Sequence, residues 1–99
     1  MADFDALTRS YRAAFLRYLP RHQEAALATG YELGRQAVVD GVTLLELASI
    51  HHDILRDVLK DTRPDDVADV ASAASTFQLE VLALYDMTQR AFLEEEKGA

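Results

Sequence analysis

A chain of 99 residues, 49% of them hydrophobic, is long enough for one globular domain and too apolar to be disordered. Its net charge of −7 argues against nucleic acid as the main ligand, and the absence of cysteine excludes disulfides, thiolate metal sites and a cysteine nucleophile. No stretch approaches the roughly 18 consecutive apolar residues of a membrane span, and the N-terminus lacks the features of a secretory signal. We therefore expect a cytoplasmic domain with no membrane partner.

Negative charge is concentrated in the second part of the chain. Residues 1–60 carry seven basic and eight acidic side chains, whereas residues 61–99 carry three basic and nine acidic ones. The second part therefore has a net charge of −6. Such an acidic end is either a solvated surface or the approach to a basic partner.

Hydrophobic residues recur with a helical period of about 3.6 in four segments, without strand-like alternation, which predicts an all-α domain of four helices. The first helix is expected over residues 5–19. It ends before Pro20, because the residue that precedes a proline is disfavoured in helical geometry. Its apolar stripe contains Phe4, Leu7, Tyr11, Ala14, Phe15 and Tyr18.

The second helix is expected over residues 21–40, where Gly41 can end it in a left-handed conformation. The third helix begins at a strong local signal. Thr43 and Glu46 match a capping box, and Val42 with Leu47 occupies the positions of a hydrophobic staple. The apolar stripe of this helix fades near residue 60 and contains Leu44, Leu47, His51, Ile54, Leu55 and Val58.

The fourth helix is expected from Pro64 to Glu96, which makes it unusually long for a domain of this size. One apolar stripe suits packing on the other helices and contains Val67, Val70, Ala74, Phe77, Val81, Leu84, Tyr85 and Thr88. A second stripe lies on roughly the opposite side and contains Leu79, Leu82, Ala83 and Met87. An ordinary surface helix has one such stripe. Either the other three helices surround this helix or, as we expect, one stripe meets a second polypeptide.

Two glycines, Gly30 and Gly34, lie four residues apart on one face of the second helix, although each costs about 1 kcal/mol relative to alanine. Such a pair allows another helix backbone to approach closely. The neighbour is either a helix of the same chain, which is the simpler explanation, or a helix of a second copy. The residues that we assign to this packing are Gly30, Gly34, Val81, Leu84 and Tyr85.

Motifs for catalysis, metal binding or nucleotide binding are absent from the sequence. His51 and His52 point about 100° apart on a helix, so they cannot bind one metal together. His51 lies on an apolar stripe and is expected to be a hydrogen-bonded interior residue. Arg35 is either a surface arginine or the partner of an acid across a helix junction. We predict that the chain is not an enzyme by itself and uses no cofactor and no metal.

The segment GYELGRQAVVDGVTLLELASIHHDIL, preceded by YRAAFLRYL, resembles the N-terminal domain of the RsbU-type serine phosphatases of the bacterial general stress response. The similarity extends over nearly the whole chain. It consists of many individually weak matches that occur in the same order. The matching positions are Tyr11, Tyr18, Arg35, Glu46, Ser49, Ile50, His51 and Leu55, together with the run FQLEVLALYDM at residues 77–87.

The resemblance implies an all-α domain of four helices that forms a homodimer and receives a switch protein of the RsbT type, a kinase of the GHKL-like class. In this family, binding activates a PPM/PP2C-type phosphatase domain in the same polypeptide. That phosphatase dephosphorylates an anti-sigma-factor antagonist and so releases a sigma factor. The partner surface implied for this sequence consists of Ala28, Tyr31, Leu79, Leu82 and Ala83.

We therefore expect residues 1–96 to form a regulatory and dimerisation domain, followed by a tail of residues 97–99. Two alternatives remain open. The first is a helical sensor that holds a small molecule in an apolar pocket lined by Tyr31, His51, Phe77 and Tyr85. The second is a plain dimerisation domain attached to another signalling output.

Overall fold

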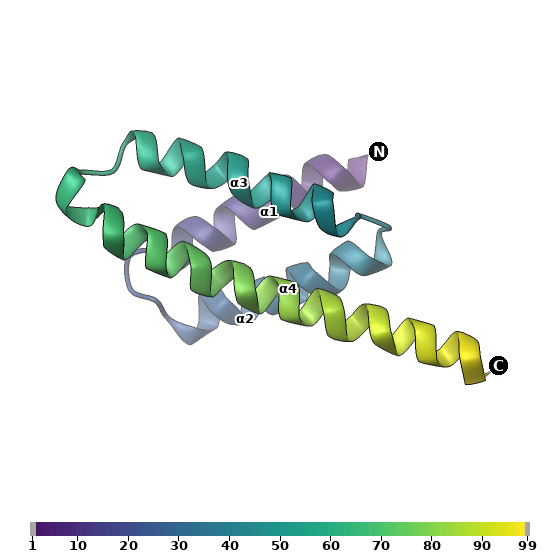
Figure 1. Ribbon diagram of the computed structural model, residues 1–99. Coiled ribbons are helices and arrows are strands. Elements are labelled where there is room, and N and C mark those ends of the chain that lie inside the picture. The colour runs from purple at the N-terminus through teal and green to yellow at the C-terminus, as the bar shows by residue number, and fades with distance from the viewer. Residues whose placement is uncertain (1, 99) are drawn as a thin grey trace.

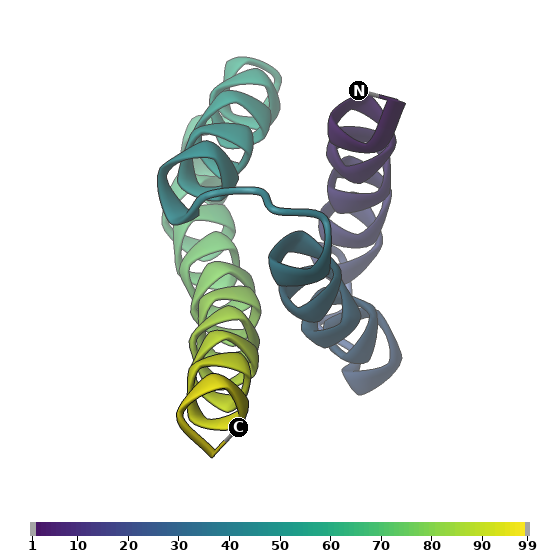
Figure 2. The same ribbon diagram turned by 90° about the vertical axis from the view of Figure 1, so that its right-hand side faces the viewer.

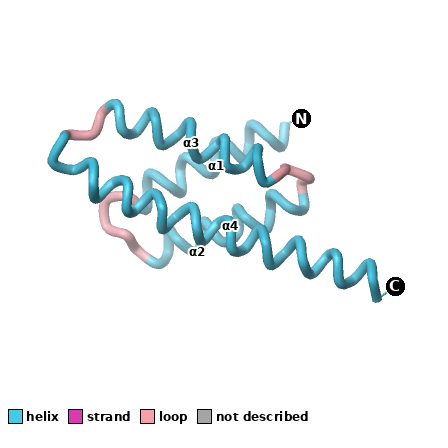
Figure 3. The backbone as a smooth tube through the Cα atoms, viewed as in Figure 1, coloured by secondary structure: helices cyan, strands magenta, loops and turns pink. Residues whose placement is uncertain are grey.

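The computed structural model describes the backbone of residues 2–98 and the side chains of residues 5–95. It contains four α-helices, α1 (Ala2–Tyr18), α2 (Glu24–Val39), α3 (Leu44–Lys60) and α4 (Val67–Gly98), and a short 3-10 helix, η1 (Pro64–Asp66), before α4. Within the described residues there is no strand (Figure 3). The predicted all-α fold with a long last helix is confirmed.

Successive helices run in opposite directions, so that α2 and α4 point one way and α1 and α3 the other (Figure 1). Viewed from the end of the bundle, α1 and α2 form one side, and α3 and α4 form the other (Figure 2). The most extensive contact is between α2 and α4. The last turns of α4 project beyond the other helices, and the molecule is elongated, with extents of 53 × 27 × 20 Å.

Aromatic rings occupy the centre of the core. The ring centroid of Phe77 on α4 lies 5.3 Å from that of Tyr11 and 5.5 Å from that of Phe15, both on α1. Tyr18, one turn further along α1, lies 5.8 Å from Phe77. All four side chains are buried, and pairs in this range of distances and tilts add to the free energy gained from burial. The inner stripes of α1 and α4 therefore meet in one core.

The end of α2 is fixed by Gly41. This residue has a φ of +74°, a conformation that costs glycine little. The N–H groups of Gly41 and Val42 donate to the carbonyls of Val38 and Ala37, which is the Schellman arrangement of a helix C-terminus. The hydroxyl of Tyr85 then donates to the carbonyl of Val42 at 2.9 Å. The connection between α2 and α3 is thereby attached to α4.

The capping box predicted for the third helix is present. The N–H of Glu46 donates to the hydroxyl oxygen of Thr43 at 3.1 Å, and the N–H of Thr43 donates to the carboxylate of Glu46 at 2.9 Å. The hydrogen bond from the N–H of Thr43, followed by one from the Thr43 side chain, lowers the pKa of the Glu46 carboxyl group, because both favour its ionised form. Val42 and Leu47 are both buried, as expected for a hydrophobic staple.

Helix boundaries differ from the predicted ones at several places. Helix α1 begins at Ala2, three residues before the predicted start, and α2 begins at Glu24, three residues after it. His22 has a φ of 51°, which interrupts the helical backbone, and Gln23 is extended and forms the N-cap. The first turn predicted after Pro64 is a 3-10 helix, and α4 continues two residues beyond the predicted end at Glu96.

By length and composition alone, the segment Pro64–Glu95 meets the criteria for a membrane span. Core helices of soluble proteins meet the same criteria. Here the side of α4 that carries Phe77, Val81 and Tyr85 is buried against the other helices. The apolar character of α4 is therefore explained in part by the core that it completes.

Candidate protein-docking surface

The contact between α2 and α4 accounts for the two helical glycines. A Cβ atom added to Gly34 would overlap the backbone carbonyl oxygen of Val81 and lie 3.0 Å from the amide nitrogen of Tyr85. A Cβ atom added to Gly30 would lie 3.1 Å from the ring of Phe77. Both glycines are buried, as are Val81 and Tyr85. Their neighbour is a helix of the same chain, so these four residues do not form a surface for a second copy.

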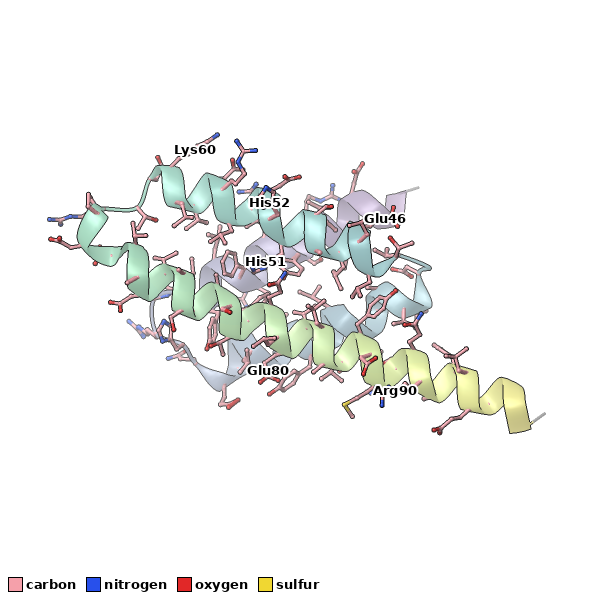
Figure 4. All side chains as sticks on the ribbon, viewed as in Figure 1. Glu46, His51, His52, Lys60, Glu80 and Arg90 are labelled. Atoms are coloured by element: carbon pink, nitrogen blue, oxygen red, sulfur yellow. The ribbon has the colours of Figure 1, made fainter. Side chains whose placement is uncertain are left out.

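His51 lies inside the core, between α3 and α4 (Figure 4). Its Nδ1 atom is 2.7 Å from the hydroxyl oxygen of Tyr11, and its ring also packs against Phe15. Burial, assisted by the neighbouring charge of His52, lowers the pKa of His51 to about 4. Its role is that of an interior hydrogen-bonding residue. Among the described residues, no group of three or more His, Asp or Glu side chains could hold a metal ion.

An apolar strip on the side of α4 that faces away from α2 remains uncovered. Leu79 and Ala83, two residues before and after the buried Val81, point about 160° away from it. Leu79 keeps 64% of its surface exposed, and Met87, one turn beyond Ala83, keeps 62%. Leu82 is partly buried against the core. We call this strip the outer α4 surface; it consists of Leu79, Leu82, Ala83 and Met87, and Met87, at its border, also lines a groove between α2 and α4.

Of the two residues of α2 assigned to the partner surface, only Tyr31 has an interaction with α4 within the described residues, whereas Ala28 is two residues before Gly30 and so points away from α4. Ala28 is exposed and Tyr31 is half-buried. Partial burial raises the pKa of Tyr31, and the nearby carboxylates of Glu80 and Glu24 raise it further. Glu80 lies on the side of α4 that borders α2 (Figure 4). Tyr31 is therefore close to one edge of the outer α4 surface, and Leu82, which packs partly against the core, lies on this surface itself.

A second uncovered region follows the seam where α2 ends and α4 continues. It is a shallow groove of about 370 Å³, which we call the α2–α4 groove. Arg35 stands in its wall, and no described acidic side chain forms an ion pair with Arg35. Of the two alternatives for Arg35, a surface arginine or the partner of an acid across a helix junction, the described residues show the surface arginine. The groove is lined by Arg35, Val39, Leu84, Met87, Thr88, Ala91 and Phe92.

Sequence reasoning did not identify Val39, Ala91 and Phe92 as surface candidates. The first apolar stripe predicted for α4 ends at Thr88. Continuing it in steps of three and four residues leads to Ala91, Phe92 and then Glu95. That continuation was detectable, and Gly41 marks the end of α2, but the point along α4 at which α2 stops depends on how the two helices pack.

The space suggested for a small ligand is occupied by side chains. Phe77 is fully buried against the rings of Tyr11, Phe15 and Tyr18. The hydroxyl of Tyr85 is bonded to a backbone carbonyl. These contacts fill the core where the sensor alternative places its ligand, so the exposed faces of α4 are the stronger candidates for function.

Comparison with known families identifies one that matches most of the chain. A family model described as "Phosphoserine phosphatase RsbU, N-terminal domain" matches residues 9–88. No match was found among curated proteins or among solved structures. The matched segment extends from α1 into α4 and so includes most of the core, both glycines and the whole outer α4 surface. The chain therefore belongs to the family of RsbU N-terminal domains, the regulatory and not the catalytic part of these phosphatases.

Proposed function

We propose that this domain is a non-catalytic regulatory module of a cytoplasmic stress-response phosphatase. It forms a homodimer and binds a switch kinase of the RsbT type, and this binding activates a phosphatase domain of the PPM/PP2C type. It needs no cofactor, nucleic acid or membrane for this role. Family membership supports the regulatory role, and the exposed surfaces of α4 support the two protein contacts.

The uncovered outer α4 surface is the observation that carries the proposal. Leu79 and Met87 are large apolar side chains on one helical strip, and neither is covered by the other helices of the chain. Burial of such surface against a partner contributes roughly 25 cal/mol per Å². Contiguous exposed apolar patches on soluble domains commonly mark protein–protein contacts. The surface therefore suits a protein partner better than a small polar ligand.

Charges around the outer α4 surface favour a partner with basic side chains. Residues 61–99 carry a net charge of −6. Asp86 is paired with Arg90 at 3.2 Å, whereas Glu80 forms no ion pair with a described side chain. A basic group of the partner can therefore pair with Glu80 at the edge of the surface. Because these charges are exposed, we expect binding to weaken as salt is added.

A single helix connects the docking surface to the projecting end of the domain. A partner changes a conformational equilibrium only through its different affinities for the two states. A kinase that binds better to one packing of the two α4 helices in the homodimer would favour that packing. This coupling gives the docked protein a physical route to control a phosphatase domain.

The substitution Leu79→Asp tests the docking role, because it places a charge on the outer α4 surface without changing a buried residue. We expect the variant to keep its helicity and dimeric state and to lose affinity for the RsbT-type kinase by about tenfold or more. Light scattering coupled to size exclusion measures the oligomeric state, and titration calorimetry measures kinase binding. Leu45→Asp, at a more exposed leucine on α3, is the matched control and should bind as the wild type does.

The possible results of this experiment separate the proposal from its alternatives. Unchanged kinase affinity of Leu79→Asp would contradict the docking role. Dissociation of the variant into monomers would instead assign the outer α4 surface to the dimer contact. A wild-type chain that binds no kinase but dimerises would leave the plain dimerisation domain as the better explanation.

A further inference from the structure

The α2–α4 groove has opposite charges at its two ends. At one end stands Arg35, at the level of Leu84, because the adjacent Gly34 packs against Leu84. Beyond the other end of the groove, Glu95 follows Ala91 by four residues and Phe92 by three, so it lies on the same face of α4. Glu95 is exposed and forms no ion pair with a described side chain.

The surface between these charges is apolar. It is formed by Val39 at the end of α2 and by Thr88, Ala91 and Phe92 on α4. Val39 keeps 58% of its surface exposed and Phe92 keeps 44%, so the chain itself does not cover this region. From Leu84 to Glu95 the helix advances by three turns, about 16 Å. Along α4, this face therefore carries a cation (Arg35) at one end, an apolar centre, and an anion (Glu95) at the other end.

We propose that this face is the contact between two copies of the chain, which pack their α4 helices antiparallel across a two-fold axis. The inference rests on the homodimer proposed above and names the surface that forms it. A two-fold axis between Thr88 and Ala91 brings Arg35 of each copy to Glu95 of the other. It also brings the apolar centres together. A two-fold contact requires a surface that complements itself. A face with a cation at one end and an anion at the other meets this requirement.

The charge pattern favours a second copy over an unrelated partner. An unrelated acidic or basic protein would be attracted by one end of the groove and repelled by the other. It also favours the antiparallel over the parallel arrangement, because parallel α4 helices in register would place Arg35 beside Arg35 and Glu95 beside Glu95. The antiparallel contact pairs all four charges and buries Phe92 of both copies.

Charge reversal tests the contact with little risk to the fold, because both charged side chains are exposed. We expect Arg35→Glu and Glu95→Arg each to raise the dimer dissociation constant roughly tenfold or more, since like charges then face each other twice in the dimer. The double variant Arg35→Glu/Glu95→Arg restores the attraction and should return the dissociation constant to near the wild-type value. Arg21→Glu makes the same change of charge in the turn between α1 and α2 and should have no effect. Sedimentation equilibrium over a range of concentrations measures these constants.

Cysteine cross-linking tests the orientation, because the wild-type chain contains no cysteine. In the antiparallel contact, residue 88 of one copy lies opposite residue 91 of the other. The variant Thr88→Cys/Ala91→Cys should therefore form a disulfide-linked dimer under mild oxidation. The matched control Ala83→Cys/Asp86→Cys has the same spacing on the outer side of α4 and should remain uncross-linked. Efficient self-cross-linking of Glu95→Cys would show parallel helices and overturn the proposed arrangement.

The outcomes distinguish this inference from the proposed function. A wild-type chain that stays monomeric at every concentration would overturn both the homodimer and the named surface. A wild-type dimer that is unaffected by Arg35→Glu and Glu95→Arg would overturn the surface and leave the homodimer standing. Weakening by each reversal, restoration in the double variant and cross-linking at residues 88 and 91 would together establish the antiparallel contact.

Discussion

The hydroxyl oxygen of Tyr11 lies 2.7 Å from Nδ1 of His51, which joins α1 to α3 inside the core. The rings are nearly perpendicular, with an interplanar angle of 77°. Burial raises the pKa of Tyr11 and lowers that of His51, so both groups are neutral in the folded protein at neutral pH. Because His51 is neutral in the folded protein and is protonated more readily in the unfolded chain, the stability of the domain depends on pH.

We expect the free energy of unfolding to fall as the pH is lowered from 6.5 towards 4. His51 has a pKa of about 4 in the folded protein and an ordinary value of 6.5 in the unfolded chain. Between these values the unfolded chain binds more protons, so acid favours unfolding. The contribution is fully present above pH 6.5, and its loss amounts to about 3 kcal/mol at most. Urea unfolding at a series of pH values measures it.

The variant His51→Gln identifies the titrating group. Its stability is lower overall, but the decrease between pH 6.5 and 4 should be much smaller than in the wild type. Carboxylates such as Asp57, whose pKa is lowered mainly by its hydrogen bond from Arg12, titrate in both proteins and cancel in the difference. His52→Gln removes an exposed histidine and should keep most of the wild-type slope. An identical pH slope for wild type and His51→Gln would refute this assignment.

The substitution Gly34→Ala should destabilise the domain by several kcal/mol, because the new Cβ overlaps the backbone of α4 and helix α2 must move away. Gly30→Ala meets only the side chains of Phe77 and Val81, which can shift, and alanine has the higher helix propensity. We expect its effect to lie within about 1 kcal/mol. Thermal and chemical unfolding of the two variants should therefore differ clearly. Equal stabilities would contradict the close approach of α2 and α4 at Gly34.

Removal of the Tyr85 hydroxyl should cost about 1–2 kcal/mol in Tyr85→Phe, because the carbonyl of Val42 loses its buried partner. Hydrogen exchange in the connection between α2 and α3 should become faster as well. Tyr18→Phe removes a hydroxyl that makes no hydrogen bond to a described residue and is the control. If both substitutions had the same small effect, the Tyr85 bond would not hold this connection.

Loss of the capping box should weaken the start of α3. Thr43→Ala removes the acceptor for the N–H of Glu46, and we expect it to lower the free energy of unfolding by about 1 kcal/mol. Thr76→Ala changes an exposed threonine inside α4 and should be neutral or slightly stabilising, because alanine has the higher helix propensity. A stability of Thr43→Ala equal to that of the wild type would show that the cap contributes nothing.

Much of the fold could be predicted from local patterns. The capping box at Thr43 and the glycine at position 41 act within a few residues, so the sequence alone located the junction between α2 and α3. The predicted start of α2 was three residues too early, because His22 adopts a left-handed conformation that cannot be predicted from its residue type. His22 stacks on Tyr18, with ring centroids 5.3 Å apart, a contact that appears only once the chain has turned.

The sequence by itself determined the number and type of elements, the inner stripe of α4 and the second apolar stripe on its opposite side. These features follow from helical periodicity, which is a property of neighbouring residues. Only the tertiary structure decided that Gly34 meets the backbone of Val81, that Leu79 stays uncovered, and that α4 runs on beyond Val39. Each of these depends on which helices lie side by side and where one stops relative to another. Periodicity shows which side of a helix is apolar, but the packing of distant segments decides what covers it.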